Sequence, residues 1–261
     1  MKLPEFIHTL QTQGRHSFAV SEAEQALGLQ KVATLNAIRR MALQGLLVSP
    51  ARGFYLIVPP EYQAYGCLPA DMFIADLMNY FGQPYYVGYL SAAQYYGAAH
   101  QKPQRFQVVT NKNRRPIQCG RIYIEFIANR KVAEMPTKPI NTLTGTINIA
   151  TAEVLMADLV SSPHHAAGIN NVATVLTELV ESIDDKQLLD LSKINTELFW
   201  VQRLGYLSEF LGLERLVPVL EKILHPHKLH WVRLVSRFGY KTLSRNNKWK
   251  IIVNTEIETD L

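Results

Sequence analysis

The sequence is poor in cysteine and has no long apolar run, and both absences limit what the protein can be. Cys67 and Cys119 are the only cysteines among 261 residues, without CxxC spacing, which argues against a disulfide framework or a zinc ribbon. We expect both thiols to be buried and reduced. No apolar stretch approaches the ~20 residues that cross a bilayer, and the N-terminus lacks the apolar core of a signal peptide. These features favour a cytoplasmic protein without membrane contact.

The motifs of common nucleotide-binding and hydrolytic sites are also missing, among them GxxxxGK[ST], GxGxxG and HExxH. Glu125 lacks the acid and lysine spacing of a metal-dependent nuclease, and Glu153 and Asp158 are expected to be helix-surface or capping charges. The histidines at 164–165 and 225–230 have no cysteine or carboxylate beside them, which favours loop histidines over a metal site. We therefore expect no catalytic residue, no metal, no cofactor and no enzymatic activity.

Positive charge is present in moderate excess, and the first sixty residues hold part of it. The chain has a net charge of +5, and 48% of its residues are hydrophobic, as in an ordinary globular protein. Residues 1–60 contain six lysine and arginine residues and three glutamates. All three glutamates lie before residue 25. A segment whose later half is purely basic favours binding to phosphates.

Apolar spacing predicts helices in the first part of the chain. Side chains recur at helical spacing from Leu3 to Leu10, and Gly14 follows as a helix stop. Ser21 is expected to cap a second, short helix, with Glu24 reaching back to it in a capping box.

A third helix is expected to begin at Gln30 and Lys31, because Gly28 lets the backbone leave the second helix abruptly while Leu29 points inward. This punctuation is typical of a helix-turn-helix. The inner face of the third helix is predicted to consist of Val32, Leu35, Ile38 and Ala42. Its outer face, which has no carboxylate, is predicted to contain Gln30, Thr34, Asn36, Ala37, Arg40 and Gln44.

Two β-rich runs around residues 49–53 predict a hairpin with a basic tip at Arg52. In a winged helix-turn-helix the third helix enters the major groove, and an arginine of the wing contacts phosphates or the minor groove. We predict such a domain over residues 1–60, with double-stranded operator DNA as its partner. A small helical domain with solvated arginines is the alternative. The predicted DNA-binding residues are Gln30, Lys31, Thr34, Asn36, Arg39, Arg40 and Arg52.

Residues 61–261 are predicted to form a larger mixed α+β domain with a small sheet and C-terminal helices. Ser91 and Thr151 are expected to cap helices, and the chain is expected to be helical from 168 to 224. The lack of strict βαβ alternation favours α+β over a doubly wound sheet. Strand patterns occur at 105–110, 121–127, 144–150, 229–235 and 248–254.

A second group of cations, Lys112, Arg114 and Arg115, lies in NKNRRP. Such a cluster is either the solvated tip of a hairpin or a patch that binds nucleic acid or an acidic partner. The residues alone leave both interpretations open.

Several blocks of the sequence resemble the AbiEi family of type IV antitoxins, also described as transcriptional regulators of viral defence. The likeness covers most of the chain. It rests on GLQKVATLNAIRRMALQGLL, RGFYLI, YYVGYLSAAQYYGAAHQKPQRFQVVTNKNRRP, INIATAEVLMADLV, VQRLGYLSEFLG and NNKWKIIVN. The resemblance implies an N-terminal domain that represses its own operon and a C-terminal domain that antagonises a nucleotidyltransferase-like toxin.

We therefore expect an antitoxin that is also a repressor, with operator DNA and a cognate nucleotidyltransferase-like toxin as its partners. One alternative is a stand-alone winged-helix regulator whose larger domain senses a ligand or dimerises. The weakest alternative is a nucleic-acid enzyme guided by the N-terminal domain.

Overall fold

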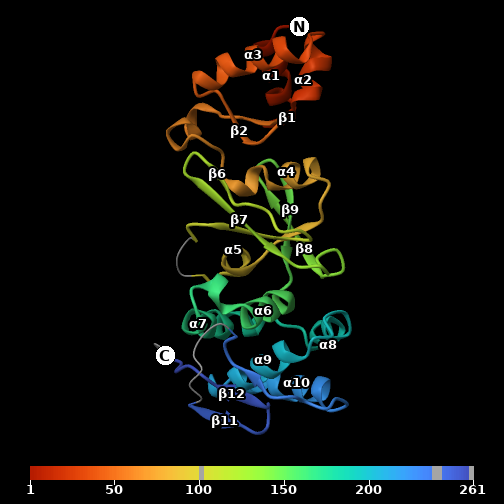
Figure 1. The fold of residues 1–261 in the computed structure, drawn as a ribbon, viewed down its shortest axis with the longest axis vertical. Helices are drawn as coiled ribbons and strands as arrows, with labels where there is room; N and C mark the ends of the chain where they lie inside the picture. Colours follow the sequence, from red (N-terminus) through yellow and green to blue (C-terminus); the bar gives the residue numbers. More distant parts are fainter. Residues whose placement is uncertain (100–102, 237–242, 259–261) are drawn as a thin grey trace. The chain divides into compact units, whose positions relative to one another are not determined.

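The protein is a mixed α+β chain in the computed structural model, which describes residues 1–99, 103–236 and 243–258 (Figure 1). The predicted α+β class is confirmed. Contacts within the chain define two compact units, and neither is a continuous segment. The first contains Met1–Tyr86, Gln104–Ala133 and Pro139–Asn148, and the second contains Val87–Pro103, Glu134–Lys138 and Ile149–Leu261. The division after residue 60 stays a prediction.

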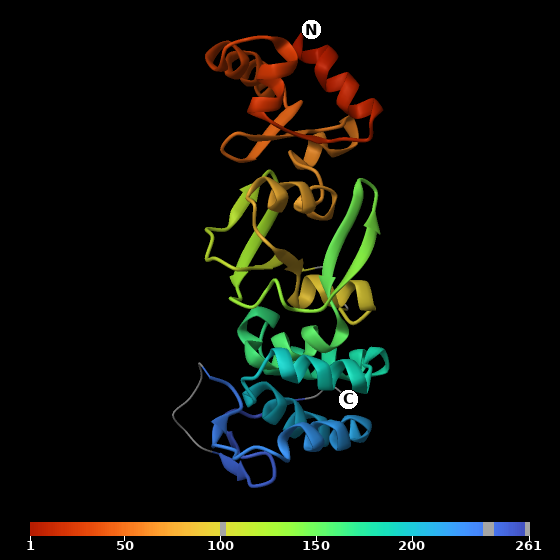
Figure 2. The same cartoon turned by 90° about the vertical axis from the view of Figure 1, so that its right-hand side faces the viewer.

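Three helices and a three-stranded sheet begin the first unit. In chain order they are α1 (Leu3–Thr12), β1 (Ser17–Ala19), α2 (Val20–Leu27), α3 (Lys31–Leu43), β2 (Leu47–Ala51) and β3 (Phe54–Ile57). The helices lie together on one side of the sheet in Figures 1 and 2. The predicted first helix is confirmed, and its recurring apolar residues are buried. One of them, Phe6, packs edge-on against Phe18 with 5.5 Å between the ring centroids.

The predicted hairpin is also confirmed. β2 and β3 pair antiparallel, with Ala51 opposite Phe54 at the tip and Arg52 and Gly53 in the turn. Gly53 has a φ of +82°, and a Cβ atom there would stand 2.6 Å from the Tyr80 hydroxyl, so the turn requires a glycine. β1 pairs with the other edge of β3, a third strand that the sequence analysis does not anticipate.

Two predictions about α2 and the turn after it are wrong. α2 begins at Val20, so Ser21 lies in its first turn and does not cap it. The cause is that β1 runs directly into the helix, and the Val20 N–H donates to the Gly53 carbonyl oxygen at 2.9 Å. Leu29 is exposed and does not point inward. Gly28 ends α2 as predicted, with a φ of +64°.

A six-stranded sheet follows the short helices η1 (Pro60–Tyr65) and η2 (Ala70–Met72) and the helix α4 (Ile74–Tyr80). Its spatial order is β6-β7-β5-β4-β9-β8, with β5 parallel to β7 and β6 antiparallel to β7. The predicted strands at 105–110, 121–127 and 144–150 are confirmed, whereas β6 and β8 are additional. The strands are β4 (Tyr85–Val87), β5 (Phe106–Thr110), β6 (Ile117–Cys119), β7 (Ile122–Ala128), β8 (Thr137–Thr142) and β9 (Gly145–Ala150).

Helices dominate the second unit, as the pattern from 168 to 224 predicts. Thr151 caps α6 as predicted, its hydroxyl accepting the Val154 N–H at 3.5 Å. Ser91 does not cap a helix, because Gly88 holds the capping position of α5 and Ser91 is buried inside that helix. α9 packs against both α6 and α10. The helices are α5 (Tyr89–Ala93), α6 (Ala152–Ser161), α7 (Ile169–Leu179), α8 (Asp185–Ile194), α9 (Phe199–Phe210) and α10 (Val217–Leu224).

The chain ends in a small sheet, as its β pattern predicts. The strands β10 (Val232–Arg233), β11 (Ser244–Asn246) and β12 (Ile251–Val253) lie in the order β10-β12-β11. β10 runs parallel to β12, and β11 runs antiparallel to it. Because α9 contacts β12, this sheet is anchored on the helices of the second unit.

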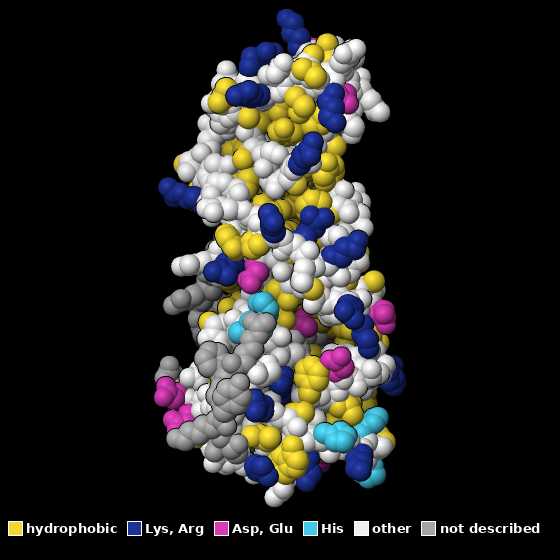
Figure 3. Space-filling view, viewed as in Figure 1, with side chains coloured by type: hydrophobic (Ala, Val, Ile, Leu, Met, Phe, Trp, Pro, Cys, Tyr) yellow, Lys and Arg dark blue, Asp and Glu magenta, His cyan; other side chains and the backbone are white. Residues whose placement is uncertain are grey.

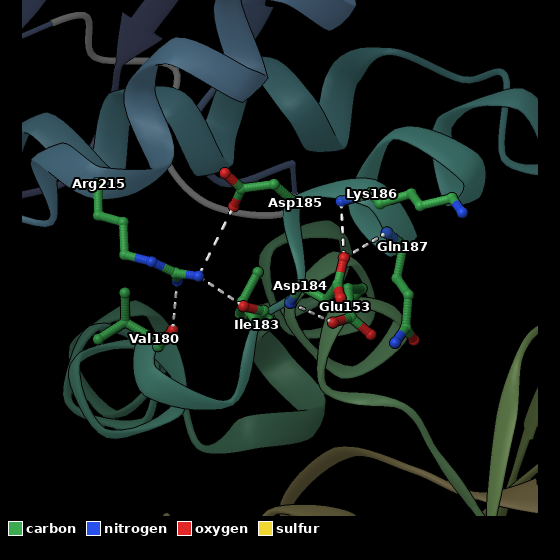
Figure 4. Close-up of polar contacts among 8 residues, drawn as sticks. All are labelled: Glu153, Val180, Ile183, Asp184, Asp185, Lys186, Gln187 and Arg215. Atoms are coloured by element: carbon green, nitrogen blue, oxygen red, sulfur yellow. Dashed lines mark hydrogen bonds and ion pairs between the residues drawn. The ribbon is translucent and has the colours of Figure 1, made fainter.

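A buried carboxylate fastens the start of α8 (Figure 4). Glu153 in α6 is only 3% exposed, and its Oε1 accepts the backbone N–H of Asp184 at 2.9 Å. Asp184 caps α8 in turn, accepting two backbone N–H groups of the first turn at 2.8 and 3.1 Å. Arg215 donates to two carbonyl oxygens of the preceding segment at 2.9 and 2.7 Å. The expectation of a surface charge is therefore wrong for Glu153, which is buried and holds the capping residue Asp184 in place.

Cys67 and Cys119 are buried and unbridged, as predicted. Their thiols interact, and the hydrogen bond to Cys119, together with burial, raises the pKa of Cys67 far above its ordinary value. Within the three described ranges of the chain, no helix combines the length and the apolar character needed to cross a membrane.

Replacing Glu153 with alanine is expected to lower the free energy of unfolding by about 1–3 kcal/mol, because the Asp184 N–H loses its acceptor. Glu153→Gln keeps an acceptor oxygen and should cost less. Urea unfolding followed by circular dichroism measures both. Asp190→Ala is the control, since the exposed Asp190 pairs with Lys193 at the surface of α8 and its loss should leave the midpoint unchanged. Equal midpoints for Glu153→Ala and Asp190→Ala would contradict the capping role.

Gly53→Ala is expected to destabilise the protein more than Gly14→Ala does. Both glycines have a left-handed φ, +82° and +72°, so each alanine carries about 1–2 kcal/mol of backbone strain. At Gly53 the added Cβ atom would also meet the Tyr80 hydroxyl. At Gly14 no atom lies within 4 Å of the added Cβ atom. Thermal unfolding compares the two variants, and Tyr80→Phe should restore part of the loss in Gly53→Ala. No difference in melting temperature would rule out the contact.

Candidate nucleic-acid interface

The orientation of α3 decides which of its side chains can meet a ligand. Ile38 is buried in the apolar cluster formed by α1, α2 and β1–β3. Thr34, one turn earlier on the same face, is completely buried, and its hydroxyl donates to the Gln30 carbonyl oxygen at 3.3 Å. The prediction that Thr34 reads DNA is therefore wrong. Because that hydroxyl is satisfied inside the helix, Thr34 can lie against the core.

The outer face of α3 combines polar and basic side chains with two exposed apolar ones. Asn36, Arg39 and Arg40 are exposed, as are Gln30 and Lys31 at the start of the helix. Val32 is 71% exposed, so the prediction that it faces the core is wrong. Leu43, which is 80% exposed, ends the same face. α3 contains no carboxylate, so the predicted absence of acids on this face is confirmed.

One acid of α2 is neutralised by a neighbouring arginine. Glu22 is bound by Arg15, with 3.0 Å between Nη2 and Oε2. This hydrogen bond raises the pKa of Arg15 above its ordinary value. Lys and Arg side chains are spread over the upper half of the view in Figure 3, where acidic side chains are sparse.

The hairpin tip and the second group of cations line one open hollow of about 740 Å³. Its walls are Pro50–Arg52 from the hairpin, Phe81 and Gln83 after α4, and residues 112–117 from the segment before β6. Arg52 is exposed, and its carbonyl oxygen accepts the Tyr80 hydroxyl at 3.0 Å. The structure thus brings Arg52 together with the cluster of Lys112, Arg114 and Arg115.

Arg114 is held rigidly in this hollow. Its guanidinium carbon lies 3.4 Å from the centroid of the Phe81 ring, and its Nε donates to Gln83 Oε1 at 2.9 Å. Burial lowers the pKa of Arg114. Lys112 and Arg115 are exposed on either side of it. Sequence reasoning missed Phe81 and Gln83. They lie 33 and 31 positions before Arg114, and local sequence patterns do not predict contacts over such separations.

Known proteins support both the fold and the family. A crystal structure of the RV2827C protein from Mycobacterium tuberculosis superposes with a TM-score of 0.67, over 98% of this chain and 90% of that one, at 15% sequence identity. At this identity the likeness concerns the fold alone. No match was found among curated proteins.

The sequence comparison is more specific. The family described as AbiEi antitoxin C-terminal domain matches residues 86–230, which is more than half of the chain. The resemblance noted from the sequence is therefore confirmed over that range, and the chain belongs to the AbiEi antitoxin family.

Proposed function

We propose that the protein is the antitoxin of a type IV toxin–antitoxin pair and also represses its own operon. In this proposal, residues 1–60 bind operator DNA as a winged helix-turn-helix, and residues 61–261 oppose a nucleotidyltransferase-like toxin. The observation that carries the proposal is the match to the AbiEi antitoxin C-terminal domain over residues 86–230. It favours an antitoxin over a stand-alone regulator, because the matched part is the antitoxin domain.

Base readout is assigned to the outer face of α3. The helix follows α2 after a tight turn at Gly28, the arrangement by which a helix-turn-helix presents its second helix to the major groove. Arg39 and Arg40 can each pair with a guanine edge, and Asn36 can pair with adenine. The exposed Val32 suits contact with a thymine methyl group. Gln30 and Lys31, at the N-terminus of α3, are assigned to bases or phosphates.

Backbone contacts are assigned to the hairpin and the hollow beside it. Arg52 at the turn is the wing residue, and Lys112 and Arg115 extend the same positive surface. Arg114 is held between Phe81 and Gln83, so it loses little side-chain entropy on meeting a phosphate. Phosphate contacts of this kind fix the position of a protein on DNA without selecting a sequence.

Arg40→Ala is expected to weaken binding to the duplex upstream of the protein's own gene by about 1–3 kcal/mol, because a guanine contact is lost. Arg52→Ala and Lys112→Ala should weaken binding to all duplexes alike. Each should also lower the slope of log affinity against log salt concentration by the contribution of about one phosphate contact. Fluorescence anisotropy at several salt concentrations measures both effects. Lys186→Ala, which removes an exposed charge from α8, is the control and should bind as the wild type does. Unchanged binding by an Arg40→Ala, Arg52→Ala protein would refute the DNA-binding assignment.

The two proposed activities are expected to separate in the 261-residue chain. Cells expressing the neighbouring toxin gene should grow when they receive either the wild type or the Arg39→Ala, Arg40→Ala variant. Only the wild type should silence a reporter behind the promoter, because α3 is changed while residues 61–261 are intact. Growth counts and reporter activity are the measurements. Failure of the wild type to restore growth would refute the antitoxin assignment.

A further inference from the structure

The positive charge of the chain is concentrated near its C-terminus. Residues 222–255 contain eight lysine and arginine residues and no aspartate or glutamate. Since the whole chain has 27 lysine and arginine residues against 22 acids, the rest carries 19 against 22 and is slightly negative. Two of the eight cations, Arg237 and Lys241, lie outside the described residues. Figure 3 shows Lys, Arg and His side chains gathered at the lower end of the view, over β11, β12 and the loop after α10.

An exposed tryptophan lies among these cations. Trp231 is 39% exposed, whereas Trp200 and Trp249 are buried. The Arg245 guanidinium carbon lies 5.4 Å from the centroid of the Trp231 ring, and Lys250 Nζ lies 5.1 Å from it. We call Trp231, Arg245 and Lys250 the Trp231 surface. An aromatic ring beside cations is the combination that binds bases by stacking and phosphates by charge.

The backbone under the Trp231 surface is fixed by one buried amide. Gln202 of α9 is buried, and its Nε2 donates to the carbonyl oxygens of His230 at 2.9 Å and Trp249 at 2.8 Å. These carbonyls directly precede Trp231 and Lys250. Because the same amide group holds both, the two functional side chains start from a fixed separation.

Trp249 provides the second anchor. Its Nε1 donates to Glu209 at 2.8 Å, and its ring covers Gly205 so closely that a Cβ atom there would stand 2.2 Å from it. Lys250, the next residue, has a φ of +53°, a conformation that costs energy for a residue other than glycine. Its carbonyl oxygen accepts the Val232 N–H at 3.0 Å, which holds this conformation in place. The site is therefore built before any ligand binds.

The neighbouring Lys248 is not available for a ligand. It forms ion pairs with Glu209 and Glu221, the second at 2.6 Å, and thereby joins the end of the sheet to α9 and α10. These two acids are occupied by Lys248.

We propose that the Trp231 surface binds single-stranded nucleic acid, with a base stacked on Trp231 and phosphates bound by Arg245 and Lys250. A single strand fits better than a duplex, because a base must be unstacked to reach the ring. This site is separate from the duplex interface assigned to α3 and the hairpin, and it does not depend on that assignment.

The test uses the full chain with Arg39→Ala and Arg40→Ala, so that binding by α3 does not contribute. A fluorescein-labelled single strand of 20 nucleotides and mixed sequence, as RNA and as DNA, is titrated with the protein; its anisotropy gives the affinity of every variant, and tryptophan fluorescence is recorded alongside for the proteins that keep Trp231. Binding should quench the emission, because Trp231 is the exposed tryptophan. Trp231→Leu should weaken binding about 5- to 150-fold, the range that corresponds to stacking of one base, while Trp231→Tyr should retain most of it. Arg245→Gln and Lys250→Gln should each lower the salt slope by about 0.7.

The controls separate the proposal from its alternatives. Melting temperatures of the Trp231 variants should equal that of the parent, since the side chain is exposed. Equal affinity of the parent and Trp231→Leu would overturn the proposal. Equal quenching by polyglutamate would overturn it too and would identify an acidic protein as the partner instead. Preference for the annealed duplex would overturn the single-strand assignment. Loss of promoter binding in the α3 variants leaves this proposal unaffected.

Discussion

Burial of Ile38 fixes the rotation of α3, and the assignment of DNA contacts depends on that rotation. A helix turned by one residue would carry Arg39 or Arg40 by about 100° and alter the surface offered to DNA. The cluster that holds Ile38 draws on α1 and on the hairpin as well as on α2. The packing of the first helix, far from any ligand, therefore determines which polar groups of the third helix are outside.

Sequence reasoning identified most helices and strands but not the phase of α3. The predicted inner stripe is Val32, Leu35, Ile38 and Ala42. In the observed stripe Leu35, Ile38 and Ala42 still pack against the core, but Thr34 is buried there and Val32 is exposed. Polarity favours the first stripe, since Val32 is apolar and Thr34 is not. The structure takes the second, because the Thr34 hydroxyl donates to a carbonyl of its own helix and can be buried. The residue type alone does not reveal whether a threonine hydroxyl forms its hydrogen bond within its own helix and can therefore be buried.

The candidate sites were harder to predict than the elements, because each joins distant parts of the chain. Arg52 and Arg114 line one hollow although they are 62 positions apart in the sequence, and Gln202 holds the carbonyls of His230 and Trp249. Such contacts follow from strand pairing and helix packing, which local periodicity does not encode. The acid-free segment from 222 to 255 was visible in the sequence, but its meaning depended on finding Trp231 exposed between two cations.

The discontinuous first unit has a consequence for how the chain acquires its structure. Its last segment, Pro139–Asn148, is made after about half of the 261 residues have been synthesised. The helices and hairpin of residues 1–60 can form early from local contacts, but the strands β5, β6 and β7 of the same unit are synthesised later. Closure of the unit therefore waits for chain elongation, and contacts of high sequence separation, which form slowly, complete it. The interval leaves the early part of the unit without its later strands while synthesis continues.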